Sequence, residues 1–405
     1  MTNVDLSATP TEIDDAVAEF RRIFAEFAQR AGEIDRDRIH PFEQVRALAD
    51  AGFGALRVPR EHRGFGVTLP ELFELLAEAG RADSNIPQIL RGHFTTVEIL
   101  RHEPDECRRV YWLRRIAEGA VFGNAQSEPA TVGVGFNIQT RIRELGGGQV
   151  ISGTKFYCTG SLFADYIRVA ALDEEDSAVF AVVPARHKGV VHVDDWDGIG
   201  QRLTGSGTTH FDAVPVEEQG ELGRSREDLK SIGPFVQIVH LANLAGIARN
   251  LVDDAVELVR SRRRTSLHAL SEQASDDPEV LGVVGEIKRH SVTADSLLRT
   301  ASESLEAANA RWEAGDRPED LYTESYIVTS AAQVAIIEAV LAAGNLIFNA
   351  GGSSAVRQGG HLDRHWRNAR TLASHNPVIY KPRVIGDYVV NGRLPKAPYD
   401  RQRKR

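Results

Sequence analysis

The chain has 405 residues, of which 42% are hydrophobic and 26% are charged, and its formal net charge is −9. This composition is typical of a globular protein, and the acidic balance argues against nucleic-acid binding. Cys107 and Cys158 lack metal or disulfide-framework spacing, the N-terminus lacks a signal-peptide pattern, and no apolar run reaches about 18 residues. We therefore expect a cytoplasmic protein that does not span a membrane.

Residues 1–118 have the pattern of a helical domain. In the stretch 11–36, apolar residues from Ile13 to Phe27 recur at spacings of three and four, which predicts an amphipathic helix. The segments 41–56, 69–85 and 89–100 repeat this pattern, with glycines between them.

The character of the sequence changes near residue 120 and again near residue 223. Residues 119–222 contain short segments rich in Val, Ile and aromatic residues, separated by glycine-rich turns, which predicts a β-domain. Residues 223–405 contain three long helical patterns, which predicts a helical-bundle domain. Strands and helices do not alternate, so we predict an α+β fold rather than a doubly wound parallel sheet.

The common catalytic and metal-binding motifs are absent from the sequence. It has no P-loop, no GxGxxG between a strand and a helix, no GxSxG and no HExxH. The glycine-rich segment 351–360 follows a long helix and is either an ordinary loop or a contact to a phosphate or cofactor. His361 and His365 have helical i, i+4 spacing, but no third ligand is evident, so we predict no metal site.

Two features of the β-domain have both a structural and a functional interpretation. Thr159, Gly160 and Ser161 form a polar turn between apolar strands, which is either a simple hairpin or a contact to the edge of a flavin ring. Trp196 is either a core aromatic residue or a side chain that covers a ring face by stacking.

The most specific signal is a set of five sequence blocks in a fixed order. They are GNAQSE (123–128), GTKFYCTGSLFAD (153–165), DDWDGIGQRLTGSGTT (194–209), SDDPEVLGVVGE (275–286) and LDRHWRNARTLASHNPVIYK (362–381). With these blocks the chain resembles the acyl-CoA dehydrogenase superfamily over nearly its full length. Within that superfamily it is most similar to the reduced-flavin-dependent monooxygenases of the dibenzothiophene monooxygenase type.

This resemblance implies the architecture in more detail. It implies an N-terminal helical domain, a middle β-barrel-like domain and a C-terminal four-helix bundle. It also implies a homotetramer packed through the bundle, with the flavin between the β-domain and the bundle.

The resemblance also bears on the reaction, because acyl-CoA dehydrogenases need a glutamate that removes a proton from the substrate. The family places this glutamate at one of two positions, which correspond to Asn376 and to the region of Val236 in this sequence. Neither residue is a carboxylate. The resemblance therefore implies a monooxygenase that uses FMNH2 and O2 through a C4a-(hydro)peroxyflavin.

Four residues are candidates for the catalytic site by this resemblance. His375 matches a histidine of the monooxygenases and is expected to handle a proton, as histidine can near neutral pH. His93 falls near a second active-site histidine, although it could instead be a core histidine between helices. Asn124 and Thr159 match polar residues near the reactive edge of the flavin.

The resemblance further implies a set of cofactor-binding residues. Tyr157 and Trp196 would pack near the flavin ring, and Arg264 and Arg370 would supply charge near its phosphate. The full set that we expect to contact the cofactor is Asn124, Tyr157, Thr159, Gly160, Trp196, Ser206, Arg264 and Arg370.

No nicotinamide-binding motif is present, so we expect a separate NAD(P)H:flavin reductase to supply the reduced cofactor. The cofactor is expected to be FMN, with FAD as the alternative, and O2 the cosubstrate. The expected substrate is a small apolar molecule oxygenated at sulfur, nitrogen or an aromatic carbon. The two rival hypotheses are an acyl-CoA dehydrogenase with a relocated base and a flavin-binding partner protein without turnover.

Overall fold

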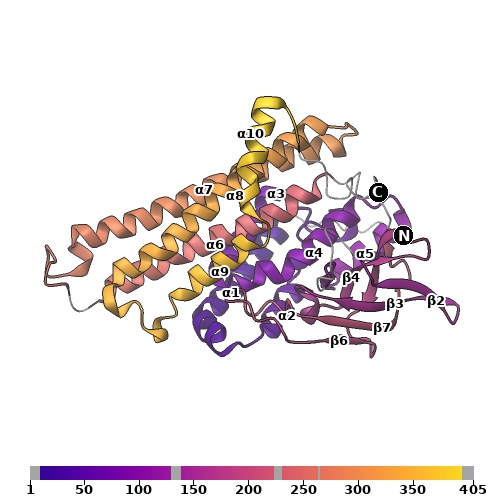
Figure 1. Ribbon diagram of the computed structural model, residues 1–405, viewed down its shortest axis with the longest axis horizontal. Helices are drawn as coiled ribbons and strands as arrows, with labels where there is room; N and C mark the ends of the chain where they lie inside the picture. Colours follow the sequence, from indigo (N-terminus) through magenta and orange to yellow (C-terminus); the bar gives the residue numbers. More distant parts are fainter. Residues whose placement is uncertain (1–9, 129–137, 223–229, 263–264, 395–405) are drawn as a thin grey trace.

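The structure is a computed structural model that describes residues 10–128, 138–222, 230–262 and 265–394 (Figure 1). Helices come first in the chain, a sheet follows, and long helices come last, so the predicted α+β fold class is confirmed. The proposed domain limits at residues 118 and 222 fall in the connections after the last N-terminal helix and after the last strand.

The N-terminal part is built from helices with apolar faces. In α1, Phe20, Ile23 and Phe24 are buried, and the rings of Phe20 and Phe24 pack edge-on against Phe53. The start of α3 is set by a capping box, in which Thr68 and Glu71 each accept a backbone N–H from the other. The helices are α1 (Pro10–Asp37), α2 (Phe42–Asp50), η1 (Phe53–Ala55), η2 (Arg60–His62), α3 (Leu69–Ala82), α4 (Asn85–Arg101) and α5 (Glu106–Ala117).

The middle part is a curled sheet of eight strands among the described residues. Its order is β6-β7-β3-β2-β4-β5-β8, and β1 pairs in parallel with β4. Gly146 and Gly147 both have positive φ and form the two-residue turn between β2 and β3. The elements are β1 (Phe122–Ala125), β2 (Arg141–Leu145), β3 (Gly148–Lys155), η3 (Ser161–Phe163), β4 (Tyr166–Leu172), β5 (Ala178–Pro184), β6 (Val190–His192), β7 (Thr209–Pro215) and β8 (Glu221–Leu222).

The C-terminal part consists of three long helices and several short ones (Figure 1). Asp277 caps the longest helix by accepting the backbone N–H groups of Glu279 and Val280. The elements are α6 (Ile232–Arg260), η4 (Ala274–Asp276), α7 (Pro278–Glu313), α8 (Glu319–Gly351), η5 (Gly352–Ser354), η6 (Gln358–Gly360), α9 (Asp363–Ser374), η7 (Val378–Tyr380) and α10 (Lys381–Asn391).

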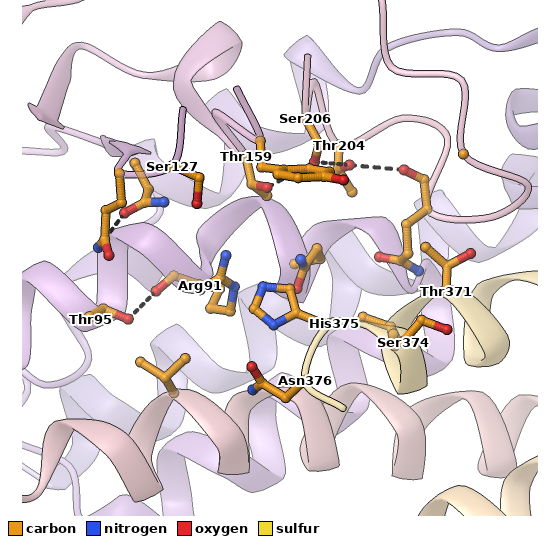
Figure 2. A pocket seen from close by; sticks show the side chains of 18 of the residues that line it. Arg91, Thr95, Ser127, Thr159, Thr204, Ser206, Thr371, Ser374, His375 and Asn376 are labelled. Carbon is orange, nitrogen blue, oxygen red and sulfur yellow. Dashed lines mark hydrogen bonds between the residues drawn. The ribbon is translucent and has the colours of Figure 1, made fainter. Parts of the chain in front are cut away.

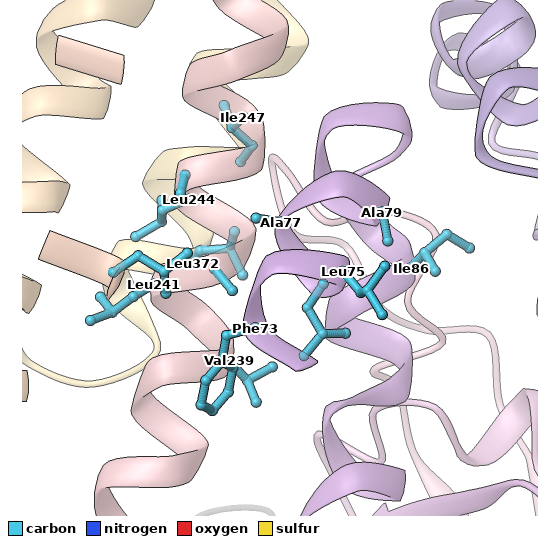
Figure 3. Packing of buried hydrophobic residues seen from close by; sticks show 14 of the residues in the cluster. Phe73, Leu75, Ala77, Ala79, Ile86, Val239, Leu241, Leu244, Ile247 and Leu372 are labelled. Carbon is cyan, nitrogen blue, oxygen red and sulfur yellow. The ribbon is translucent and has the colours of Figure 1, made fainter. Parts of the chain in front are cut away.

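The main core lies where α3 packs against α6 (Figure 3). The rings of Phe73 and Phe235 are 5.4 Å apart at this contact. A Cβ on Gly246 would lie 2.5 Å from the carbonyl oxygen of Ala77, so only glycine allows the two backbones to approach this closely. The first part of the chain and the bundle therefore share one core.

Two helical stretches, 232–260 and 319–354, are long and apolar enough to cross a membrane by length and composition alone. In the most apolar window of the first, 78% of the residues are buried inside the protein, and in that of the second, 50% are buried. Burial in a helical core explains the same composition, since a helix that is apolar all round is typical of a protein interior.

Candidate active site

A cavity of about 910 Å³ lies between the sheet, α4, α6 and the end of α9 (Figure 2). Its volume is in the range of sites that hold cofactors and small ligands. Of the residues predicted for the site, seven line this cavity: Asn124, Tyr157, Thr159, Trp196, Ser206, Arg370 and His375.

A chain of hydroxyl groups forms the wall of the cavity on the side of the sheet. The hydroxyl oxygens of Thr159 and Ser206 are 2.8 Å apart, and those of Ser206 and Thr204 are 2.7 Å apart. Thr204 donates to the carbonyl of Gln201 at 2.8 Å, which orients the chain. All three hydroxyl residues are buried. Each hydroxyl can donate and accept, so this wall can bond the polar edge of a bound ring.

Gly160 does not line the cavity but holds this wall against α4. Its φ is +80°, and its N–H donates to the carbonyl of Thr204 at 3.1 Å. A Cβ here would lie 2.3 Å from the carbonyl oxygen of Ile89 on α4. Both the backbone conformation and the close contact therefore require glycine.

We expect Gly160→Ala to lower the free energy of unfolding more than Gly147→Ala does. Gly147 has a similar φ of +88°, but a Cβ there meets nothing within 4 Å. Gly147→Ala therefore measures the cost of the left-handed conformation alone, about 1–2 kcal/mol. Gly160→Ala should cost roughly 1–3 kcal/mol more because the backbone must move. Urea unfolding of both variants measures the difference, and equal values would contradict the proposed contact.

Trp196 and Tyr157 line the same side of the cavity, where it opens to solvent. Trp196 is partly exposed, and its indole N–H donates to the carbonyl of Gln201 at 2.9 Å. Its ring lies 6.0 Å from that of Tyr157, which is 53% exposed and has a positive φ of 58°. Such a φ is uncommon for a residue other than glycine and is often seen at functional sites. Trp196 is thus a cavity residue and not a core residue.

Asn124 reaches the cavity from β1. Its side-chain oxygen accepts from the amide of Gln126 at 2.8 Å, and its carbonyl accepts from Ser161 at 3.2 Å. The segment that follows β1 is held by Lys155, which is fully buried and pairs with Glu128 at 2.6 Å. Burial lowers the pKa of Lys155, and the ion pair keeps the group charged in the interior.

His375 follows the last residue of α9 and faces the cavity opposite the hydroxyl wall (Figure 2). Its ring lies 4.3 Å from the ring of His240 on α6. His375 is exposed in the single chain. Protein packed around its ring nevertheless removes water from it, and this desolvation together with the positive charge of Arg91 lowers its pKa below the usual value. The imidazole is therefore neutral at pH 7 and can accept or return a proton.

Asn376 and Val236, which the resemblance relates to the two positions of the family's glutamate, both line the cavity, and neither is a carboxylate. Asn376 donates through its amide to Gln237 at 2.8 Å, and Val236 contributes an apolar side chain. Among the described residues that line the cavity there is no Asp or Glu at all. This part of the protein therefore offers a proton-abstracting group only in His375.

The end of α9 is held by contacts to the other parts of the chain. Asn368 accepts the backbone N–H of Gln201 at 2.6 Å, and Arg367 pairs with Asp35 at 2.6 Å. A Cβ on Gly200 would lie 2.1 Å from the carbonyl oxygen of Arg367. These contacts fix the position from which His375 enters the cavity.

Three predicted features lie elsewhere. His93 is fully buried, with Nε2 2.9 Å from the carbonyl of Gly54 and Nδ1 accepting from the N–H of Phe122. It does not line the cavity, and its contacts match the alternative of a core histidine. Arg264 lies outside the described residues. The segment 351–360 is at the end of α8 and does not line the cavity.

Of the histidine pair 361 and 365, His365 forms part of a structural contact. His365 and Arg364 both bind Asp254 on α6, at 2.7 Å and 2.8 Å. Asp254 is therefore a partly buried link between α6 and α9. In the described part of the chain no three His, Cys, Asp or Glu residues form a cluster suited to a metal ion.

Sequence reasoning missed Arg91 and His240. Arg91 lines the cavity from α4 and is only 8% exposed, and His240 lies behind His375 and is 1% exposed. A signal was present for His240, which is a polar residue in a largely apolar stretch of α6. No such signal marked Arg91, since polar residues occur all around α4.

Comparisons with known proteins agree with this arrangement. The family model "Acyl-CoA dehydrogenase, N-terminal domain" matches residues 9–120, and "Acyl-CoA dehydrogenase, C-terminal domain" matches residues 238–379. The chain is 29% identical to a dibenzothiophene monooxygenase of Rhodococcus erythropolis, with 94% of each chain covered. It is 28% identical to a probable FMNH2-dependent monooxygenase, SfnC, of Pseudomonas putida, with 94% of this chain and 96% of the relative covered.

Solved structures give the same result. FMN-bound TdsC from Paenibacillus sp. A11-2 superposes with a TM-score of 0.86 at 26% identity, covering 94% of this chain and 98% of TdsC. Methanesulfinate monooxygenase MsuC from Pseudomonas fluorescens superposes with a TM-score of 0.84 at 27% identity, covering 96% and 99%. From its sequence and its fold, the chain belongs to the acyl-CoA dehydrogenase family.

Proposed function

We propose that this chain is a flavin-dependent monooxygenase that uses reduced FMN and O2 to oxygenate a small substrate at sulfur, nitrogen or an aromatic carbon. One observation carries the proposal. The cavity has a hydroxyl wall suited to a flavin, while Asn376 and Val236, which the resemblance relates to the two positions of the dehydrogenase base, line it without a carboxylate. The relatives named as monooxygenases support the same assignment.

The residues present fit a flavin. The hydroxyls of Thr159 and Ser206 can bond a heterocycle edge, Trp196 can cover a ring face, and Arg370 supplies positive charge at the opposite side of the cavity. We favour FMN over FAD because TdsC was crystallised with FMN and SfnC is named for FMNH2. When bound, the reduced flavin would supply the activated form of O2.

The protein side chains would then have three roles. The buried walls exclude bulk water, which protects reactive species from hydrolysis. Asn124 and Thr159 place hydrogen-bonding groups in the cavity wall, next to where the flavin ring would lie. His375, neutral at pH 7, takes up and returns the single proton that the transfer of an oxygen atom requires.

The partners follow from the same proposal. A separate NAD(P)H:flavin reductase in the cytoplasm would deliver the reduced cofactor, in line with the FMNH2 dependence in the name of SfnC. We further propose a homotetramer packed through the C-terminal helices. Large apolar side chains on α10 and just before it are exposed in the single chain, which supports this packing: Ile379, Tyr380, Val389 and Val390.

The test of the proposed function compares two assays on the purified protein. In the first, an unrelated reductase supplies FMNH2 in air, and thioethers, sulfinates, amines and indoles are screened for a gain of one oxygen atom. In the second, the oxidised holoprotein is mixed with acyl-CoAs and a dye acceptor. We expect oxygenated product in the first and no flavin bleaching in the second. Bleaching by an acyl-CoA would instead establish a dehydrogenase with a relocated base, and no activity in either assay would favour a binding protein.

A further inference from the structure

Arg91 is a buried charge without an ion-pair partner among the described residues. It lies on α4, lines the cavity and is 8% exposed. Among the described residues none forms an ion pair with its guanidinium, and its Nε has no hydrogen-bond partner. Burial lowers its pKa to about 10, so the group is still charged at pH 7.

Another buried arginine in the same domain shows what a structural role looks like. Arg57 is 5% exposed, and it pairs with Glu98 at 2.7 Å and donates to the carbonyl of Val67. Burying a charge without such partners is costly in free energy. A buried arginine that lacks such partners and faces a cavity is therefore suited to bind a negatively charged group of a ligand.

The surroundings of Arg91 also favour an anion. The described lining residues include no carboxylate, and His375 stands beside Arg91 (Figure 2). Behind His375, both ring nitrogens of His240 are buried and have no hydrogen-bond partner among the described residues. A negative group at this end would receive bonds from Arg91 and would be attracted by the polar rings next to it.

We infer that the substrate of the proposed monooxygenase carries a monoanionic acid group with two oxygens, a carboxylate or a sulfinate, and that Arg91 binds this group. This inference rests on the proposed function. The planar guanidinium fork matches two acid oxygens. Apolar lining residues on α4, α6 and α9, namely Ile99, Val236 and Leu372, leave room for an apolar body of the substrate. The names of the relatives include both a neutral heterocycle and a sulfinate, and Arg91 selects the charged class for this chain.

The binding test uses full-length protein saturated with oxidised FMN, so that no turnover occurs. Calorimetry would compare benzoate and benzenesulfinate with neutral benzamide. We expect both anions to bind at least about 10-fold more tightly than benzamide, since hydrogen bonds to charged groups are the stronger ones. The stronger of the two anions would identify the acid class.

Variants test whether Arg91 is responsible. Arg91→Gln should weaken binding of the anions by roughly 10- to 100-fold and leave benzamide unchanged, and Arg91→Lys should restore part of the loss. Arg22→Gln removes the same charge from the exposed face of α1, where Arg22 pairs with Glu19, and should change neither affinity. Equal binding of benzoate and benzamide to the wild type, or unchanged anion binding by Arg91→Gln, would overturn the inference.

Two further measurements separate this role from others. A structural arginine stabilises the free protein, so a marked fall in the melting temperature of Arg91→Gln would contradict a ligand-binding role. We expect an unchanged or higher value, because an unpaired buried charge is removed. FMN and FMNH2 affinities should also be unchanged, and a loss equal to that for benzoate would assign Arg91 to the cofactor.

The inference and the proposed function can fail separately. Oxygenation of neutral substrates by a protein that does not bind the anions would overturn the substrate class and leave the monooxygenase function in place. Anion binding that depends on Arg91, without oxygenation of any substrate, would overturn the monooxygenase function and support the anion site.

Discussion

The His375→Ala variant is expected to keep consuming O2 in the presence of FMNH2 while it loses most of its oxygenated product. In the proposed function the imidazole, which faces the cavity, handles the proton, and its lowered pKa keeps it neutral at pH 7. A positioned acid or base contributes roughly 10²–10⁴-fold to a proton transfer, so the product formed per O2 should fall by at least about 100-fold. The missing product should appear as hydrogen peroxide.

The measurement combines an oxygen electrode, peroxide detection and product quantification by mass spectrometry. His375→Gln keeps a hydrogen-bonding group of similar reach but cannot titrate near pH 7, and should behave like the alanine variant. His210→Ala, which removes an exposed histidine on β7, serves as the control and should retain wild-type coupling. An unchanged ratio of product to O2 in His375→Ala would show that the proton is handled elsewhere.

Replacing Glu98 with glutamine is expected to lower the free energy of unfolding by about 3–5 kcal/mol, the usual cost of breaking a buried ion pair. Glu98 is 2% exposed and lies between Arg57 at 2.7 Å and Arg101 at 3.1 Å. Its loss leaves Arg57 without its carboxylate and leaves Arg101 paired with Glu313 alone. Because Glu98 shares α4 with Arg91, its pairing also secures the helix that forms one wall of the cavity.

The same pair predicts how stability depends on pH. Burial raises the pKa of Glu98, but the charges of Arg57 and Arg101 more than offset this and lower it to about 2. The pKa in the unfolded chain is about 4.3. A folded pKa below the unfolded one means that the stabilisation is complete above about pH 5 and is lost as the pH falls toward 2. The stability of Glu98→Gln should therefore decline less steeply than that of the wild type over this range.

Urea unfolding at a series of pH values measures both effects. Glu19→Gln is the matched control, because Glu19 pairs with Arg22 on the exposed face of α1 and solvent screens that pair. A pH profile of Glu98→Gln parallel to that of the wild type would show that Glu98 is not the group that titrates.

The sequence predicted the cavity wall on the side of the sheet better than the opposite wall. Thr159, Ser206 and Trp196 belong to motif blocks in which neighbours along the chain are also neighbours in space. The resemblance carried them, because they lie inside the sequence blocks on which it rests. The α+β order was equally accessible, since hydrophobic periodicity is local.

The helical wall depended on details that a sequence pattern does not contain. Gln88, Arg91, Thr95 and Ile99 face the cavity, and their spacing of three and four places them on one side of α4. His93 is two residues beyond Arg91, which turns it by about 200° around the helix. The register of α4 is set by its packing against α6 and β1, so only the assembled fold separates the cavity residue from the core residue.

The way α9 is anchored bears on how enzymes of this fold diverge. Asn368 holds the helix to the loop between β6 and β7, and Arg367 holds it to α1, whereas His375 and Asn376 come after its last turn. Substitutions at these two positions change the reactive groups without touching the anchors. Evolution can therefore exchange one reaction for another here through very few mutations, while the folding of the scaffold is preserved.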